Sequence, residues 1–138
     1  MQSPSPTKPA SRLDGLNVLI VEDSYLVAES LAQILTEAGA TVVGPVPRAE
    51  DAHRLIEERT INAALLDVKL AVGNTMTIAQ ALQARECPFA FVTGYGSPAL
   101  PEDAFREVPV LRKPVNRDEL LSTLSRLIAA ADRRHLDS

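Results

Sequence analysis

The sequence of 138 residues has no tryptophan, only one cysteine, and no apolar run as long as a membrane-spanning helix. A lone cysteine, Cys87, excludes an internal disulfide, and no cluster of cysteines and histidines has the spacing of a zinc site. The first twelve residues, MQSPSPTKPASR, have no apolar core of the kind that a secretion signal needs. We therefore expect a cytoplasmic protein, with Cys87 as a small buried apolar residue and no membrane partner.

Long basic segments are also missing, because no run of Lys and Arg exceeds two residues and the net charge is −4. Binding to the phosphate backbone depends on such clusters, so we expect no nucleic-acid partner. Hydrophobic residues make up 46% of the chain, which is enough for one folded domain. We place this domain at residues 13–131, between a disordered tail rich in proline and serine at 1–12 and a polar tail at 132–138.

Short apolar runs alternate with amphipathic segments from Leu16 onward. The runs NVLIV, ATVVG, INAALLD, PFAFVT and VPVLRK predict five strands. Between and after them, YLVAESLAQILTEAG, PRAEDAHRLIEERT, TMTIAQALQARE and NRDELLSTLSRLIAAAD predict helices, the last ending at Asp132. This alternation is typical of an open parallel sheet covered on both faces. Glycines and prolines in GYGSPALPEDAFREVP leave room for only a short or irregular helix between the last two strands.

Polar residues follow four of the five predicted strands. Glu22 and Asp23 end the first, Asp67 the third, Thr93 the fourth and Lys113 the fifth. Because the carboxyl ends of parallel strands meet at one edge, we expect these side chains to lie close together. Clustered carboxylates favour a hard cation such as Mg²⁺. A carboxylate beside such an ion can attack phosphorus while a lysine and a hydroxyl stabilise the phosphoryl oxygens.

These residues, in this order and at intervals of 44, 26 and 20 from Asp23 onward, resemble the receiver domain of two-component response regulators, which is CheY-like. The resemblance runs from about Leu16 to Ala131. It implies a flavodoxin-like, doubly wound α/β fold with five parallel strands in the order 2-1-3-4-5. It also implies that Asp67 accepts a phosphoryl group from a sensor histidine kinase or a histidine phosphotransferase.

The same resemblance assigns the other site residues. Mg²⁺ is expected to be held by Asp23, Asp67 and the backbone carbonyl of Lys69, with Glu22 assisting through water. In similar domains the lysine that corresponds to Lys113 pairs with the acyl phosphate. The hydroxyl that corresponds to Thr93 moves towards it, which carries the signal to another face.

One position departs from the family pattern. Most receivers have an aromatic residue three positions before the lysine, where this chain has Val110. The stretch PFAFVTGYG is similar to the PFxFATGY signature of an alphaproteobacterial receiver subgroup associated with HWE and related histidine kinases. In that comparison Tyr95 takes the aromatic role, on a loop made adaptable by Gly94 and Gly96. Alternatively, the two glycines only form a turn and Tyr95 packs locally.

The leading prediction is a stand-alone receiver that signals through contacts with an unidentified downstream protein, as an adaptor, a competitor for phosphoryl groups or a relay. It would be a phosphoacceptor that supports its own phosphorylation and dephosphorylation, not an enzyme with a separate substrate. One alternative is a Mg²⁺-dependent phosphohydrolase, but Lys69 stands where such enzymes need a second acid. Another is a binding module that is never phosphorylated.

Overall fold

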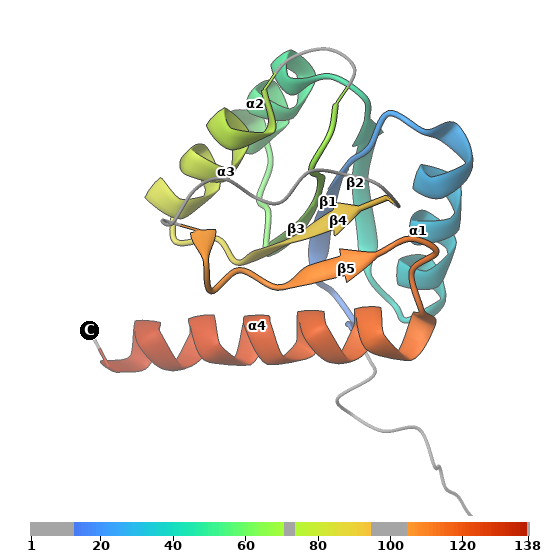
Figure 1. Cartoon of the computed structure of the whole chain (residues 1–138). Helices are drawn as coiled ribbons and strands as arrows, with labels where there is room; N and C mark the ends of the chain where they lie inside the picture. Colours follow the sequence, from blue (N-terminus) through green and yellow to red (C-terminus); the bar gives the residue numbers. More distant parts are fainter. Residues whose placement is uncertain (1–12, 71–73, 95–104, 138) are drawn as a thin grey trace, which may run out of the picture.

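Five parallel strands form one sheet in the order β2-β1-β3-β4-β5 (Figure 1). The structure is a computed structural model that describes residues 13–70, 74–94 and 105–137. The predicted fold and strand order are confirmed. The strands are β1 (Asn17–Val21), β2 (Thr41–Val46), β3 (Ala63–Asp67), β4 (Phe89–Thr93) and β5 (Val110–Arg112).

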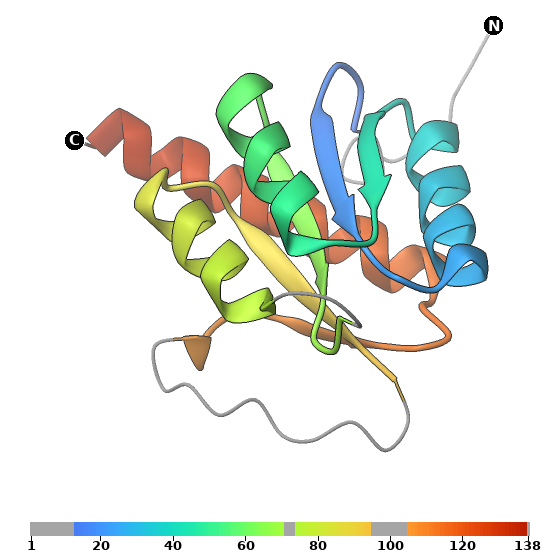
Figure 2. The same cartoon turned by 90° about the horizontal axis from the view of Figure 1, so that it is seen from above.

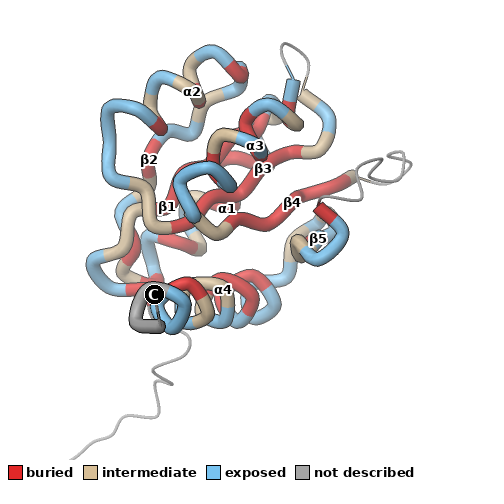
Figure 3. Tube along the Cα trace, turned by 90° about the vertical axis from the view of Figure 1, so that its left-hand side faces the viewer, coloured by how far each residue is buried: buried red, intermediate tan, exposed pale blue. Residues whose placement is uncertain are grey.

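Helices cover both faces of the sheet (Figure 2). They are α1 (Tyr25–Glu37), α2 (Ala49–Glu58), α3 (Thr75–Ala84) and α4 (Arg117–Asp137). Alternate residues of β1 point to opposite faces, so Val18 and Ile20 pack with α1 and α4, whereas Leu19 and Val21 pack with α2 and α3. Every residue of β3 and β4 is buried, as Figure 3 shows for both strands. Such strands read as continuous apolar runs because both of their faces are covered.

The helix ends follow the capping residues in the sequence. Ser24 Oγ accepts a hydrogen bond from the Val27 N–H at 3.4 Å, and Asn116 Oδ1 accepts one from the Glu119 N–H at 2.9 Å. Gly39 has a φ of 95° just after α1, a left-handed conformation that glycine adopts easily. These residues mark both ends of α1 and the start of α4, whereas α2 begins without a side-chain cap.

Strand β2 continues past the predicted segment ATVVG to Val46, and Gly44 makes this possible. Gly44 has a φ of 91°, and a Cβ there would lie 2.9 Å from Val46 N and 3.1 Å from Ile20 O. Only glycine fits this position. The extension brings the Val46 carbonyl to the Glu22 N–H, which donates to it at 3.0 Å, so β2 supports the residues that follow β1.

The closing helix is longer than predicted. Helix α4 runs to Asp137, past the predicted end at Asp132, so residues 133–137 of the predicted polar tail continue the helix. No glycine or proline interrupts this stretch, and arginine and leucine favour helix. The final turns of α4 extend past the strands (Figures 1 and 2). The predicted tail at 1–12 lies outside the described residues.

Residues 95–104, within the segment predicted to hold a short or irregular helix, also lie outside the described part. After them, the chain makes a single turn at Phe105 before β5. The Phe105 ring packs edge-on against Phe89 and Phe91, with centroids 6.2 Å and 5.9 Å away, and so covers the start of β4. Within the described residues, no helix is long and apolar enough to cross a membrane.

Candidate functional site

Three carboxylates meet where β1 and β3 end. Glu22, Asp23 and Asp67 each offer an oxygen atom, and these atoms lie within 4.8 Å of one another. Glu22 and Asp67 are buried, whereas Asp23 is exposed. The parallel order of the strands explains the cluster, because β1 and β3 are neighbours and both end at this edge. The predicted acidic cluster is therefore present in the fold.

Lys113, which follows β5, supplies the positive charge at this edge. Its Nζ lies 3.1 Å from Glu22 Oε2 and 3.7 Å from Asp67 Oδ2. Its backbone N–H donates to the Thr93 carbonyl at 2.9 Å, which continues the pairing of β5 with β4. One ammonium group thus faces two buried carboxylates, with the third carboxylate alongside. The cluster keeps an excess of negative charge.

Asp67 is held on several sides. Its Oδ1 accepts a hydrogen bond from the Lys69 N–H at 3.0 Å, and its backbone carbonyl accepts one from Thr75 Oγ1 at 2.7 Å. Burial is the main reason that the pKa of Asp67 rises from 3.8 to about 7; the Lys69 N–H lowers it, Glu22 raises it and Lys113 lowers it. Sequence reasoning missed Thr75, because a threonine at the start of a helix has no distinctive pattern.

Glu22 is only partly satisfied by the protein. Its Oε2 accepts hydrogen bonds from the Ser24 N–H at 3.0 Å and from Lys113 Nζ at 3.1 Å. Its Oε1 is buried and has no hydrogen-bond partner among the described residues. An unpaired buried oxygen is costly unless another group meets it. Together with the oxygens of Asp23 and Asp67, it forms a donor set that fits a hard divalent cation such as Mg²⁺.

Thr93 lies at the same edge, on the strand next to Asp67. Val92 is paired with Asp67 across β3 and β4, so Thr93 is one residue further along β4. Thr93 is buried, and its hydroxyl lies 3.5 Å from the Gly94 carbonyl. Lys69 directs its N–H towards Asp67. The predicted switch residue Tyr95 lies outside the described residues.

Two hollows flank the start of α1 beside the acidic cluster. One, of about 430 Å³, is bounded by Glu22 and Asp23 at one end and by Pro45 and Pro47 at the other. The second, of about 180 Å³, lies between α1 and the segment that begins at Lys113. The first hollow is therefore open to Glu22 and Asp23, and the second to Lys113.

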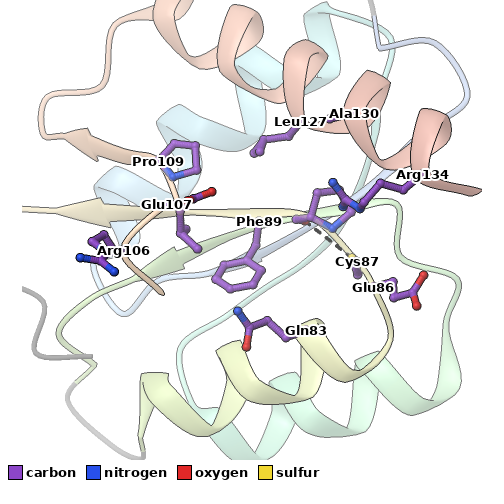
Figure 4. Close-up of a pocket in the computed structure, with 12 residues that line it drawn as sticks. Gln83, Glu86, Cys87, Phe89, Arg106, Glu107, Pro109, Leu127, Ala130 and Arg134 are labelled. Atoms are coloured by element: carbon purple, nitrogen blue, oxygen red, sulfur yellow. Dashed lines mark hydrogen bonds between the residues drawn. The ribbon is translucent and has the colours of Figure 1, made fainter. Parts of the chain in front are cut away.

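A hollow of about 730 Å³ lies at the opposite, amino-terminal edge of the sheet, between the end of α3 and the last turns of α4 (Figure 4). Cys87 lines it, and burial raises the pKa of this thiol to about 11, so it is almost entirely protonated at neutral pH. None of the predicted site residues lines this hollow. Although this hollow is larger than those beside α1, we place the candidate site at the carboxyl-terminal edge, where the three carboxylates and Lys113 lie together.

The family assignment rests on comparison with known proteins. The sequence model of the response regulator receiver domain matches residues 18–125. The chain belongs to this family. The receiver is similar to the solution structure of SdrG from Sphingomonas melonis Fr1, with 36% identity and a TM-score of 0.70 over 84% of this chain and 95% of that chain. It is also similar to a CheY-like receiver domain protein from Methanospirillum hungatei JF-1, with 26% identity and a TM-score of 0.75 over 86% and 98% of the two chains.

Two curated relatives are longer proteins. An uncharacterized response regulatory protein of Vibrio cholerae is 27% identical over 115 residues, which cover 82% of this receiver and 48% of the relative. The sensor protein TorS of Escherichia coli is 28% identical over 122 residues, which cover 85% of this receiver and 13% of TorS. The receiver thus spans about half of one relative and a small part of the other.

Proposed function

We propose that this receiver accepts a phosphoryl group on Asp67 from a phosphohistidine of a sensor histidine kinase or a histidine phosphotransferase, and then signals through protein contacts in a two-component phosphorelay. The main support for this proposal is the environment of Asp67. It is buried at the end of β3, it accepts a hydrogen bond from the Lys69 N–H, and it lies 3.7 Å from Lys113 Nζ and within reach of two further carboxylates.

The transfer exchanges one bond to phosphorus for another. The P–N bond of a phosphohistidine whose second ring nitrogen carries a proton breaks, and a P–O bond to the ionised carboxylate of Asp67 forms. The imidazole leaves as a neutral ring, so no further reactant is needed. Lys113 and the Lys69 N–H can then meet the oxygens of the acyl phosphate, with Thr93 as a further donor. Attack of water on the acyl phosphate returns inorganic phosphate and free Asp67.

Asp23, Asp67 and the backbone carbonyl of Lys69 would hold Mg²⁺, with Glu22 assisting through water. When bound, the ion neutralises charge on the carboxylates and on the incoming phosphoryl oxygens. Glu22 Oε1, which is buried and has no hydrogen-bond partner in the described part of the chain, is a group that such an ion or its water would satisfy. In this proposal the protein is a phosphoacceptor and not an enzyme with a separate substrate, and it works in the cytoplasm.

The partner would approach beside α1. Tyr25 and Leu26 are 74% and 76% exposed at the start of this helix, next to Glu22 and Asp23. Exposed apolar side chains between two hollows offer contact area without blocking the carboxylates. We therefore propose that the histidine-bearing partner docks on Tyr25 and Leu26 as its phosphohistidine reaches Asp67.

The finer assignment rests on sequence. We propose that the receiver belongs to the PFxFATGY subgroup, that its kinase is of the HWE type, and that Tyr95 replaces the aromatic residue missing at Val110. Amide chemical shifts of Tyr95→Phe and Tyr95→Ala, recorded with and without beryllofluoride as a phosphoryl mimic, test the role of Tyr95. If beryllofluoride changes the chemical shifts of Tyr95→Ala as it changes those of the wild type, Tyr95 is not the switch residue.

Phosphoryl transfer from purified, labelled kinases tests the proposed function. A panel of HWE and other histidine kinases is autophosphorylated and mixed with the receiver and Mg²⁺. We expect the most active kinase of the panel to transfer label rapidly to the wild type. No label should reach Asp67→Ala, or the wild type in the presence of EDTA. Leu26→Ala, which leaves the carboxylates untouched, should slow transfer from that kinase but not phosphorylation by acetyl phosphate. Equal labelling of Asp67→Ala would refute the proposal.

A further inference from the structure

Thr75 is the first residue of α3, and its side chain reaches back to the end of β3. The residue is only 4% exposed, and its Oγ1 donates to the backbone carbonyl of Asp67 at 2.7 Å. A buried hydroxyl is costly unless it is hydrogen-bonded, and this bond meets that need. It joins two residues that lie eight positions apart in the chain, so it ties the start of α3 to the residue that carries the central carboxylate.

The first turn of α3 forms further hydrogen bonds of its own. Asn74 Oδ1 accepts the Met76 N–H at 2.8 Å, which caps the helix. The Thr77 hydroxyl donates to the Asn74 carbonyl at 2.8 Å, and His53 Nε2 of the neighbouring helix α2 lies 3.0 Å from the same hydroxyl. These bonds join α2 to the first turn of α3, and the Thr75 hydroxyl separately joins that turn to Asp67.

The Thr75 anchor acts on the carbonyl side of the Asp67–Val68 peptide, whose N–H donates to the Val92 carbonyl at 3.0 Å, whereas the Lys69 and Lys113 contacts act on the carboxylate. Oδ1 accepts the Lys69 N–H at 3.0 Å, and Oδ2 lies 3.7 Å from Lys113 Nζ. Without the Thr75 bond only the N–H side of this peptide is held, and a shift of the Asp67 backbone would move the carboxylate relative to both groups. A small misplacement of a reacting group is enough to slow a reaction strongly, so the position of this peptide matters for any chemistry at Asp67.

We propose that Thr75 is a positioning residue, whose hydroxyl holds the Asp67 carbonyl so that the carboxylate meets the Lys69 N–H and faces Lys113. The inference rests on the proposed function of Asp67. Thr75 touches neither the phosphoryl group nor the cation; it acts through Asp67. Because serine keeps the hydroxyl and alanine or valine does not, the chemistry of the anchor can be separated from the volume of the side chain.

The test compares Thr75→Val, Thr75→Ala and Thr75→Ser with a matched control, Thr77→Val. The control removes a threonine hydroxyl from the same helix turn, one that bonds Asn74 rather than Asp67. Amide hydrogen exchange of Lys69 is measured in EDTA, so that it reports the protein without metal. Beryllofluoride affinity in Mg²⁺ and the initial rate of phosphorylation by acetyl phosphate are then measured, with the melting temperature of each variant.

We expect Thr75→Val and Thr75→Ala to speed exchange of the Lys69 amide and to weaken beryllofluoride binding and slow phosphorylation by about tenfold, the size typical of lost supporting contacts around metal sites. Thr75→Ser should restore all three readouts to within about twofold of the wild type, and Thr77→Val should leave them unchanged. If Thr75→Val does not fold, the pair Thr75→Ser and Thr75→Ala still differs by the hydroxyl alone.

Wild-type values for Thr75→Ala in all three measurements would overturn the inference, as would equal losses in Thr75→Ser and Thr75→Ala. A different outcome would show that the proposed function is wrong. In that case the wild type itself would neither bind beryllofluoride nor incorporate phosphate. Lys69 exchange in EDTA remains informative in that case, because it depends on the anchor and not on phosphorylation.

Discussion

The two edges of the sheet treat their polar groups in opposite ways. At the amino-terminal edge, the Asn17 N–H donates to Asn62 Oδ1 at 2.7 Å and Asn17 Nδ2 donates to the Thr60 carbonyl at 2.9 Å. These groups are neutral and satisfy one another. At the carboxyl-terminal edge, Glu22 and Asp67 are buried beside a single ammonium group, and Glu22 Oε1 has no partner among the described residues.

The comparison distinguishes polar groups that stabilise the fold from polar groups that are available to bind a ligand. Neutral side chains that pair with each other stabilise the ends of strands and leave nothing for a ligand. Buried charges of one sign destabilise the fold unless something from outside completes them, and sites of this kind cluster where function is located. Substitutions at the carboxyl-terminal edge should therefore change phosphorylation, whereas substitutions at the amino-terminal edge should change only stability.

We expect the largest effect from a substitution of Lys113. Among the described residues, it is the only cationic side chain within ion-pair distance of Asp67. Lys113→Ala removes the charge that faces Glu22 and Asp67, and we expect the rate of phosphorylation by acetyl phosphate to fall by about 100- to 1,000-fold, the range for loss of one preorganised charged donor. Arg112→Ala is the matched control, because Arg112 is an exposed basic neighbour on β5. A comparable loss in both variants would mean that general positive charge, not the site lysine, matters.

Asp67→Asn should stabilise the receiver in the absence of metal. The pKa of Asp67 is raised from 3.8 to about 7 in the fold, so below about pH 3 both the folded and the unfolded states are protonated and no penalty arises. As the pH rises from about 3 to about 7, the unfolded chain loses this proton first, and the fold is progressively destabilised. We expect Asp67→Asn to raise the free energy of unfolding by about 2 kcal/mol at about pH 8 and by almost nothing at about pH 3.

Urea unfolding of both proteins in EDTA, at several pH values, measures this difference. Mg²⁺ should stabilise the wild type more than Asp67→Asn, since the substitution removes one of the proposed ligands. A wild type that is more stable than Asp67→Asn at pH 8 without metal would show that the carboxyl edge is satisfied by the protein alone, and the contrast between the edges would be lost.

The smallest effect belongs to the amino-terminal edge. Asn62→Ala removes the acceptor for the Asn17 N–H, and we expect the free energy of unfolding to fall by about 1 kcal/mol. Beryllofluoride affinity and the phosphorylation rate should stay within about twofold of the wild type, because the change lies at the far end of the strands. A marked loss of phosphorylation in this variant would break the separation of roles.

Sequence patterns predicted most of the fold because its interior strands are buried on both faces. β1, β3 and β4 appear as nearly unbroken apolar runs, and the polar residues at the ends of β1, β3 and β5 mark the edge where Glu22, Asp67 and Lys113 meet. Parallel topology made this inference possible, since residues far apart in the chain share an edge only when the strands run in the same direction.

What the sequence did not predict depends on single contacts. The extension of β2 requires the close approach of Gly44 to Ile20 and Val46, which no periodicity reveals. The role of Thr75 depends on one hydrogen bond between a helix start and a strand end. The burial of Glu22 Oε1 depends on how its side chain packs. The subgroup assignment and the role of Tyr95 stay predictions.

The chemical identity of the modified residue decides whether Asp67 is the phosphoacceptor. The receiver is treated with acetyl phosphate and Mg²⁺ and then reduced with borohydride, which converts an aspartyl phosphate to homoserine. Peptide mass spectrometry then locates the change. We expect homoserine at position 67 alone, and none in samples with EDTA or in Asp67→Asn. Homoserine at another position, or unmodified Asp67 in a protein that carries phosphate, would show that Asp67 is not the phosphoacceptor.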